Sequence, residues 1–145
     1  MSGSVGWLPR DSRVRALART ISIGLPSGVL AGLGAYILSQ PSLTPVSGTT
    51  PPLALVVLGG AFVPLLSDRL RRSVAAMLCA YATGIAVHLG AYVAPLWVLS
   101  YPPSARDLLL PRFLAEALTV VFFQYTLAFF AGYLLVTTVS GYLGA

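Results

Sequence analysis

His88 is the only histidine of the chain and the side chain best suited to chemistry. It stands inside a long apolar run and follows Ala76, Ala80 and Gly84 at intervals of four residues, so all four share one face of a helix. An ionisable group inside an apolar segment is a candidate functional site by default. Three roles fit: a haem ligand, a proton relay, or a hydrogen-bonding partner of a neighbouring helix.

The last apolar run carries two further polar side chains, Gln124 and Glu116. Gln124 and His88 each lie eleven residues from the outer end of their predicted helices, which places both about 16 Å deep. We therefore predict that Gln124 hydrogen-bonds to His88 in the interior of a helical bundle. Glu116 follows Arg112 by one helical turn, which predicts an ion pair. The alternative for Glu116 is a carboxylate at the mouth of a polar pathway.

The other reactive residue types do not form a catalytic pattern. The sequence holds four acidic residues and a single cysteine, Cys79, which is out of helical phase with His88. It has neither paired carboxylates nor a glycine loop of the kind that cradles phosphate. We therefore predict no enzyme, no metal site and no cofactor.

The composition of the chain identifies its class. Of 145 residues, 57% are hydrophobic and only 9% charged, and the mean hydropathy is +0.84. A water-soluble domain carries roughly 25% charged residues, so we predict an all-α integral membrane protein. The net charge of +5 comes from nine arginines placed between apolar runs. This pattern reports on membrane orientation and predicts no nucleic-acid partner.

Four apolar segments are candidates for membrane spans, at residues 20–38, 50–66, 73–99 and 113–143. The second is short and contains Pro51, Pro52, Gly59, Gly60 and Pro64, so a broken helix or a re-entrant hairpin is its alternative. We predict a four-transmembrane-helix bundle at residues 20–145, preceded by a cytoplasmic segment at 1–19 for which an interfacial helix is the alternative. The segment at 101–112 holds three prolines and is expected to form a single helical turn on the membrane surface.

The arginines fix the expected orientation. With four spans, one side of the membrane receives two of them and the other side receives seven: Arg10, Arg13, Arg15, Arg19, Arg69, Arg71 and Arg72. Positive charge favours the cytoplasmic side, so both termini are predicted inside and the protein is predicted to be a multi-pass protein of the cell membrane. The seven arginines are orientation signals or contacts to lipid headgroups.

Small residues recur every four positions in the first apolar run, at Gly24, Gly28 and Gly32. Such a row lets a second helix approach closely, which is a principal source of helix association in lipid. Ala76, Ala80 and Gly84 form a similar row in the third run. We predict that both rows are packing faces, either within one chain or between chains.

Two functional classes follow from these features. The first is a structural or accessory subunit that works by helix packing, with itself or with another membrane subunit as partner and with membrane lipids around it. The second is an oligomeric transporter or channel subunit with a polar pathway near His88 and Gln124. A haem-binding membrane anchor that uses His88 is a third hypothesis, although one chain offers a single axial ligand.

Overall fold

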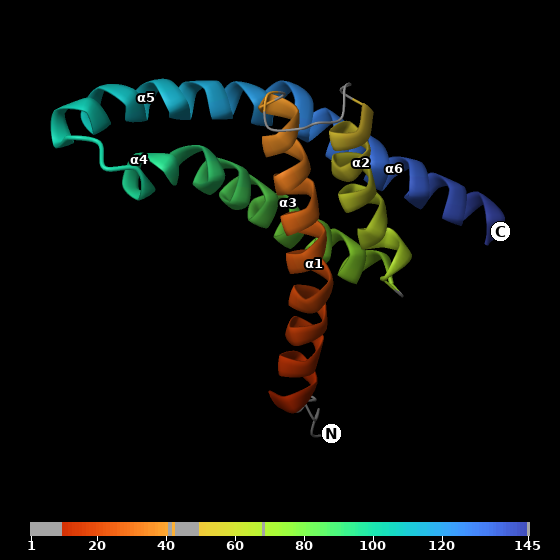
Figure 1. The fold of residues 1–145 in the computed structure, drawn as a ribbon. Helices are drawn as coiled ribbons and strands as arrows, with labels where there is room; N and C mark the ends of the chain where they lie inside the picture. Colours follow the sequence, from red (N-terminus) through yellow and green to blue (C-terminus); the bar gives the residue numbers. More distant parts are fainter. Residues whose placement is uncertain (1–9, 41, 43–49, 68, 145) are drawn as a thin grey trace.

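The computed structural model describes residues 10–40, 42, 50–67 and 69–144, and its elements in these ranges are all helices (Figure 1). In chain order they are α1 (Arg10–Ser39), α2 (Thr50–Leu65), α3 (Leu70–Val93), α4 (Pro95–Val98), α5 (Pro103–Val120), the π-helix η2 (Val121–Tyr125) and α6 (Thr126–Leu143). Three stretches are long and apolar enough to cross a membrane: Val14–Ser39, Leu70–Val98 and Pro103–Leu143. The helix Thr50–Leu65 is apolar but shorter.

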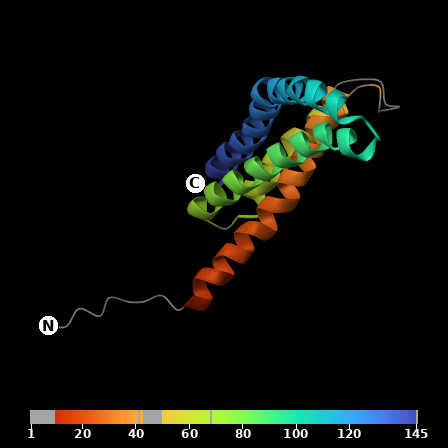
Figure 2. The ribbon, with the colours of Figure 1, turned by 90° about the vertical axis from the view of Figure 1, so that its left-hand side faces the viewer.

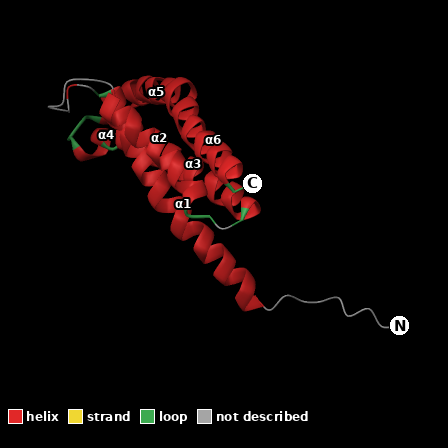
Figure 3. Ribbon diagram, turned by 90° about the vertical axis from the view of Figure 1, so that its right-hand side faces the viewer, coloured by secondary structure: helices red, strands yellow, loops and turns green. Residues whose placement is uncertain are grey.

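The helices α1, α2, α3 and α6 form the bundle, and α5 lies across one end of it. Helix α1 packs on both α2 and α3, and α2 packs on α6. Figures 2 and 3 show the start of α3, the end of α6 and the first turns of α1 at one end. The end of α1, α4 and the start of α5 lie at the opposite end. The first turns of α1 project beyond the other helices (Figure 3).

The glycine row of α1 lies against the small-residue row of α3. A methyl group added at Gly24 would stand 2.8 Å from Cys79 Cβ, and one added at Gly32 would stand 3.0 Å from Gly84 Cα. At Gly28 it would collide with the carbonyl oxygen of Ala80. These separations leave no room for a side chain, so the two backbones touch directly within one chain.

Helix α2 uses its paired glycines in two directions. A methyl group at Gly59 would lie 2.6 Å from Ala31 Cβ on α1. A methyl group at the adjacent Gly60 would collide with the carbonyl oxygen of Phe129 on α6. Because neighbouring residues of a helix point about 100° apart, the Gly59-Gly60 pair lets α2 sit tightly between α1 and α6.

Aromatic side chains fill the space between α3 and the η2–α6 segment. The Tyr81 ring on α3 stacks on the Tyr125 ring at a centroid distance of 5.5 Å and touches Phe129 and Phe130. Tyr125 and Phe129 are fully buried. Large rings therefore form the core on this side, whereas small residues form the contacts of α1.

One alternative for the second apolar segment does not occur, and one sequence-based expectation was wrong. Helix α2 is unbroken, because Pro51 and Pro52 lie in its first turn, where no backbone N–H is needed, and Pro64 lies in its last turn. Residues 103–112 form the first half of α5 instead of an isolated turn. The irregularities lie elsewhere. The helix α3 is interrupted at Ala94, and the continuous stretch α5–η2–α6 changes to π-helix at η2 and bends there (Figure 2).

We expect Gly28→Leu to lower the free energy of unfolding by about 1–3 kcal/mol, because the new side chain cannot fit against Ala80 and Thr83. Leu33 on the exposed side of α1 provides the control, and Leu33→Ala should change little. Thermal unfolding of both variants in the same detergent tests this. Equal midpoints for the two variants would contradict it.

Candidate functional site

A π-helical turn, η2, interrupts the helical stretch at residues 103–143 and marks a bend in it. The carbonyl oxygen of Val121 accepts the backbone N–H of Thr126, five residues on, and also the Thr126 hydroxyl at 2.7 Å. A π-turn leaves an extra residue in the helix and often marks a functional position. Here the threonine hydroxyl holds the widened turn closed.

Two tyrosines anchor this bend to α3. Thr126 has used its only hydroxyl proton on Val121, so the Tyr81 hydroxyl donates to Thr126 Oγ1 at 2.9 Å. The Tyr125 hydroxyl donates to the carbonyl oxygen of Tyr81 at 3.2 Å. A third link, between Ser73 Oγ and the Tyr133 hydroxyl at 3.3 Å, joins the start of α3 to α6. The polar groups of this interface are therefore paired with each other.

His88 lies one turn beyond Gly84 on the same face of α3 and has no solvent exposure, as predicted for a bundle-facing position. Its ring packs against Tyr92 at 5.2 Å, and Tyr92 in turn meets Tyr36 of α1 edge to face at 5.7 Å. The backbone of Ala117 on α5 lies beside the imidazole. Even so, neither ring nitrogen makes a hydrogen bond of acceptable geometry to a described residue. His88 is thus enclosed and unsatisfied.

Gln124 does not pair with His88, and this prediction was wrong. It belongs to η2, is exposed, and lines a groove with Leu38 and Leu53, at the last turn of α1 and the first turn of α2. The depth estimate had assumed a straight fourth helix beginning near residue 113. Gln124 instead faces the groove beside α1 and α2, whereas the His88 ring faces Tyr92 and the backbone of Ala117.

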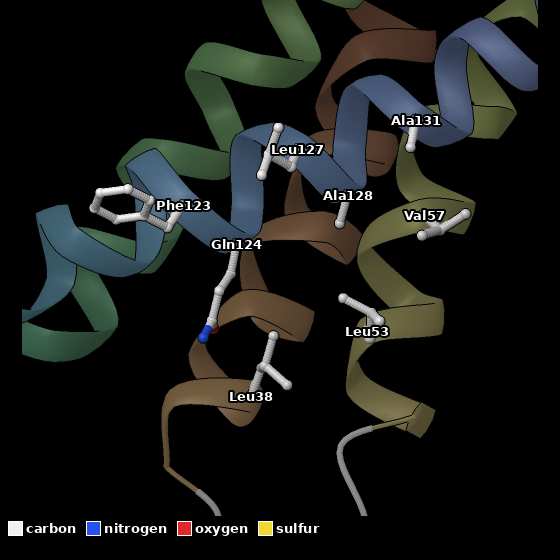
Figure 4. Close-up of a pocket in the computed structure, with 8 residues that line it drawn as sticks. All are labelled: Leu38, Leu53, Val57, Phe123, Gln124, Leu127, Ala128 and Ala131. Atoms are coloured by element: carbon white, nitrogen blue, oxygen red, sulfur yellow. The ribbon is translucent and has the colours of Figure 1, made fainter.

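Two adjoining cavities surround Gln124. The first, about 580 Å³, runs between α1, α2 and α6 (Figure 4). Its other described lining residues are all apolar: Leu38, Leu53, Val57, Phe123, Leu127, Ala128 and Ala131. The second, about 390 Å³, shares Leu38 and Gln124 with the first and adds polar groups at Ser39, Tyr92, Glu116 and Thr119. Figure 4 shows the Gln124 side chain reaching from η2 toward Leu38, and both residues line both cavities.

Glu116 makes the contact that its spacing predicts. Its Oε1 lies 3.4 Å from Nε of Arg112, one turn earlier on α5, and both side chains are largely exposed. Such a pair contributes little to stability. Glu116 also faces the second cavity, so the carboxylate lies at the rim of the groove that contains Gln124.

The remaining candidate residues separate into two groups. The side chains of Arg10 and Arg13 lie outside the described part of the chain, although both positions belong to α1. The other five arginines of that set belong to the first turns of α1 and the start of α3: Arg15, Arg19, Arg69, Arg71 and Arg72. Arg69, Arg71 and Arg72 line a common groove with Ala16, Leu17 and Thr20 of α1, so the start of α3 lies beside the part of α1 that carries Arg15 and Arg19.

The sequence analysis missed the tyrosine network and the bend. The spacing of Tyr81, Tyr125, Tyr133 and Thr126 predicts no contact between the two helices. One signal was available: a threonine hydroxyl in an apolar helix must find an acceptor, either in its own helix or across an interface.

The unpaired His88 and the hydrogen-bonded Tyr81 give opposite expectations for the effect of a substitution on stability. His88→Leu removes two unpaired nitrogens, so the free energy of unfolding should stay the same or rise by on the order of 1 kcal/mol. Tyr81→Phe removes the hydrogen bond to Thr126 and should lower the free energy of unfolding by about 0.6 kcal/mol. Unfolding of both variants in detergent is the measurement. A larger loss from His88→Leu than from Tyr81→Phe would show that the histidine is satisfied after all.

The chain was compared with family models, with curated proteins and with solved structures. No family model, no curated protein and no solved structure matches the chain.

Proposed function

We propose that the chain is a four-span membrane protein with both termini in the cytoplasm. Four helices, α1, α2, α3 and α6, run in alternating directions, and the three longest stretches have membrane-spanning length. The arginines at the start of α3 and on the first turns of α1 lie at one end, as the positive-inside rule requires for the cytoplasmic face. Helix α2, at 16 residues, crosses where the bilayer adapts to a short span.

Helix α5 lies at the outer membrane surface in this arrangement. It carries four charged residues, Arg106, Asp107, Arg112 and Glu116, of which three are exposed. A helix with this charge content is costly at the centre of a bilayer but stable along its surface. The π-turn at η2 then converts the surface direction of α5 into the crossing direction of α6.

Labelling of single cysteines tests the topology. In a Cys79→Ala background, Ser104→Cys at the start of α5 should react with an impermeant maleimide from outside, and Gly144→Cys only after the membrane is opened. Both positions are exposed at ends of helices, so neither substitution disturbs packing. Reaction of Ser104→Cys only from the cytoplasm would contradict the proposed orientation.

Within this topology we infer that the chain is a structural or accessory subunit that binds another transmembrane helix, from a second copy or from a different membrane protein. The observation that carries this inference is Gln124. Its side chain is exposed on the wall of an apolar groove, and its amide has no hydrogen-bond partner among the described residues. Next to lipid tails such an amide lacks a partner, whereas a neighbouring helix supplies one.

The enclosed environment of His88 favours this function over transport. A pathway for protons or ions needs polar side chains that face water. The imidazole has no exposed surface and stands among aromatic rings and backbone. The tyrosine hydroxyls of the interior are likewise occupied by internal hydrogen bonds. The polar groups that remain available are those at the groove around Gln124.

Substitution of Gln124 tests the partner site. Gln124→Leu should weaken association in membranes by roughly three- to thirtyfold, the range expected for one interhelical hydrogen bond. Leu135→Ala, which alters an exposed residue of α6 that does not line the groove, is the matched control. The readout is the oligomer fraction by single-molecule photobleaching in vesicles, for a second copy, or co-purification after cross-linking, for another subunit. Unchanged association in both assays would refute the inference.

A further inference from the structure

A third cavity, lined by arginine side chains, lies at the opposite end of the bundle from Gln124. It has a volume of about 490 Å³ and separates the first turns of α1 from the start of α3. Three arginines, Arg69, Arg71 and Arg72, form one wall. The rest of the described lining is nearly apolar: Ala16, Leu17, Thr20 and Ala75.

The charge of this groove is strongly one-sided. None of its described lining residues is acidic, and the first turn of α3 contains no acidic residue. Counting Asp68 from the sequence, the segment at 68–72 holds three arginines against one aspartate and keeps a charge of +2. Guanidinium groups present planar pairs of N–H donors that match the oxygens of a phosphate.

The apolar part of the groove points to the kind of molecule that carries the phosphate. Leu17 lines the groove, and its side chain is 61% exposed. Further along the same two helices, Ile21 of α1 and Val74 and Leu78 of α3 are exposed apolar residues. A headgroup held by the arginines would therefore leave its acyl chains beside apolar side chains. A soluble phosphate compound gains nothing from that surface.

We propose that the groove formed by Arg69, Arg71 and Arg72 with residues 16–20 of α1 is a binding site for the phosphate of an anionic lipid headgroup. The phosphate lies between the guanidinium groups, and the acyl chains descend along α1 and α3. Basic pockets between helices at the cytoplasmic surface bind anionic lipids in this way. The lipid as source rests on the membrane placement proposed above, whereas the phosphate chemistry of the site does not.

Lipid retention by the purified full chain tests the proposal. Protein extracted into neutral detergent is supplied with phosphatidylglycerol or with phosphatidylcholine, and the bound lipids are counted by native mass spectrometry. We expect one phosphatidylglycerol to be retained in preference to phosphatidylcholine. Arg69→Gln and Arg71→Gln should each lower the affinity roughly fivefold, the effect of one arginine near a membrane surface, and the double variant more.

Two control variants distinguish binding in this groove from a general attraction of anionic lipid to a positively charged protein. Arg112→Gln removes the same charge at the other end of the molecule and should leave the retention unchanged. Ala75→Phe fills the groove from an exposed position without changing the charge and should reduce the retention. Thermal unfolding verifies that each variant is folded. A loss with Arg112→Gln equal to that with Arg71→Gln, or no loss with any groove variant, would overturn the proposal.

Competition with inorganic phosphate identifies the source of the ligand. If the lipid is the ligand, millimolar phosphate displaces it weakly, because the acyl chains add to its affinity. Displacement at equal concentrations would reject the lipid and leave a site for a soluble phosphate. These outcomes are independent of the cysteine labelling, so a failure here and a failure of the proposed topology are distinguishable.

Discussion

The contact between the backbones of α1 and α3 is the constraint on which the other helices depend. Gly84 shows why: a methyl group added there would stand 3.0 Å from the carbonyl oxygen of Gly28. The same methyl group would collide with the hydroxyl of Tyr125. The glycine thus stands where the tight α1–α3 contact meets the aromatic core. Any side chain there would separate α1 from α3 and push Tyr125 out of its stack on Tyr81.

The aromatic side of α3 determines the bend in the last long helix. Tyr81 and Tyr125 occupy the space beside α3 and are linked to the widened turn by hydrogen bonds to Thr126 and to the Tyr81 carbonyl. With the turn fixed there, α5 is directed across the end of the bundle and covers His88 at Ala117. The burial of the histidine therefore follows from a bend formed more than thirty residues later in the chain.

This dependence explains how much the sequence could predict. The four-residue spacing of Gly24, Gly28 and Gly32 and of Ala76, Ala80 and Gly84 is local, so helical periodicity was enough to identify both faces and to place His88 on one of them. The position of Gln124 required the path of the backbone through η2. A single extra residue in a helical turn rotates and redirects everything after it, and no hydrophobic period records it. The predicted pairing failed because Gln124 faces the groove beside α1 and α2 instead of His88.

The polar residues acquire different roles from their surroundings, even where the sequence made them look alike. Tyr81, Tyr125 and Thr126 use their hydroxyls on one another and on backbone carbonyls, which makes them part of the fold. His88 is enclosed without a partner, and its ring serves as packing against Tyr92. Gln124 and the arginines at the start of α3 face outward, at grooves at opposite ends of the molecule. The groups available to a partner therefore lie on the periphery, in agreement with the proposed association with another helix.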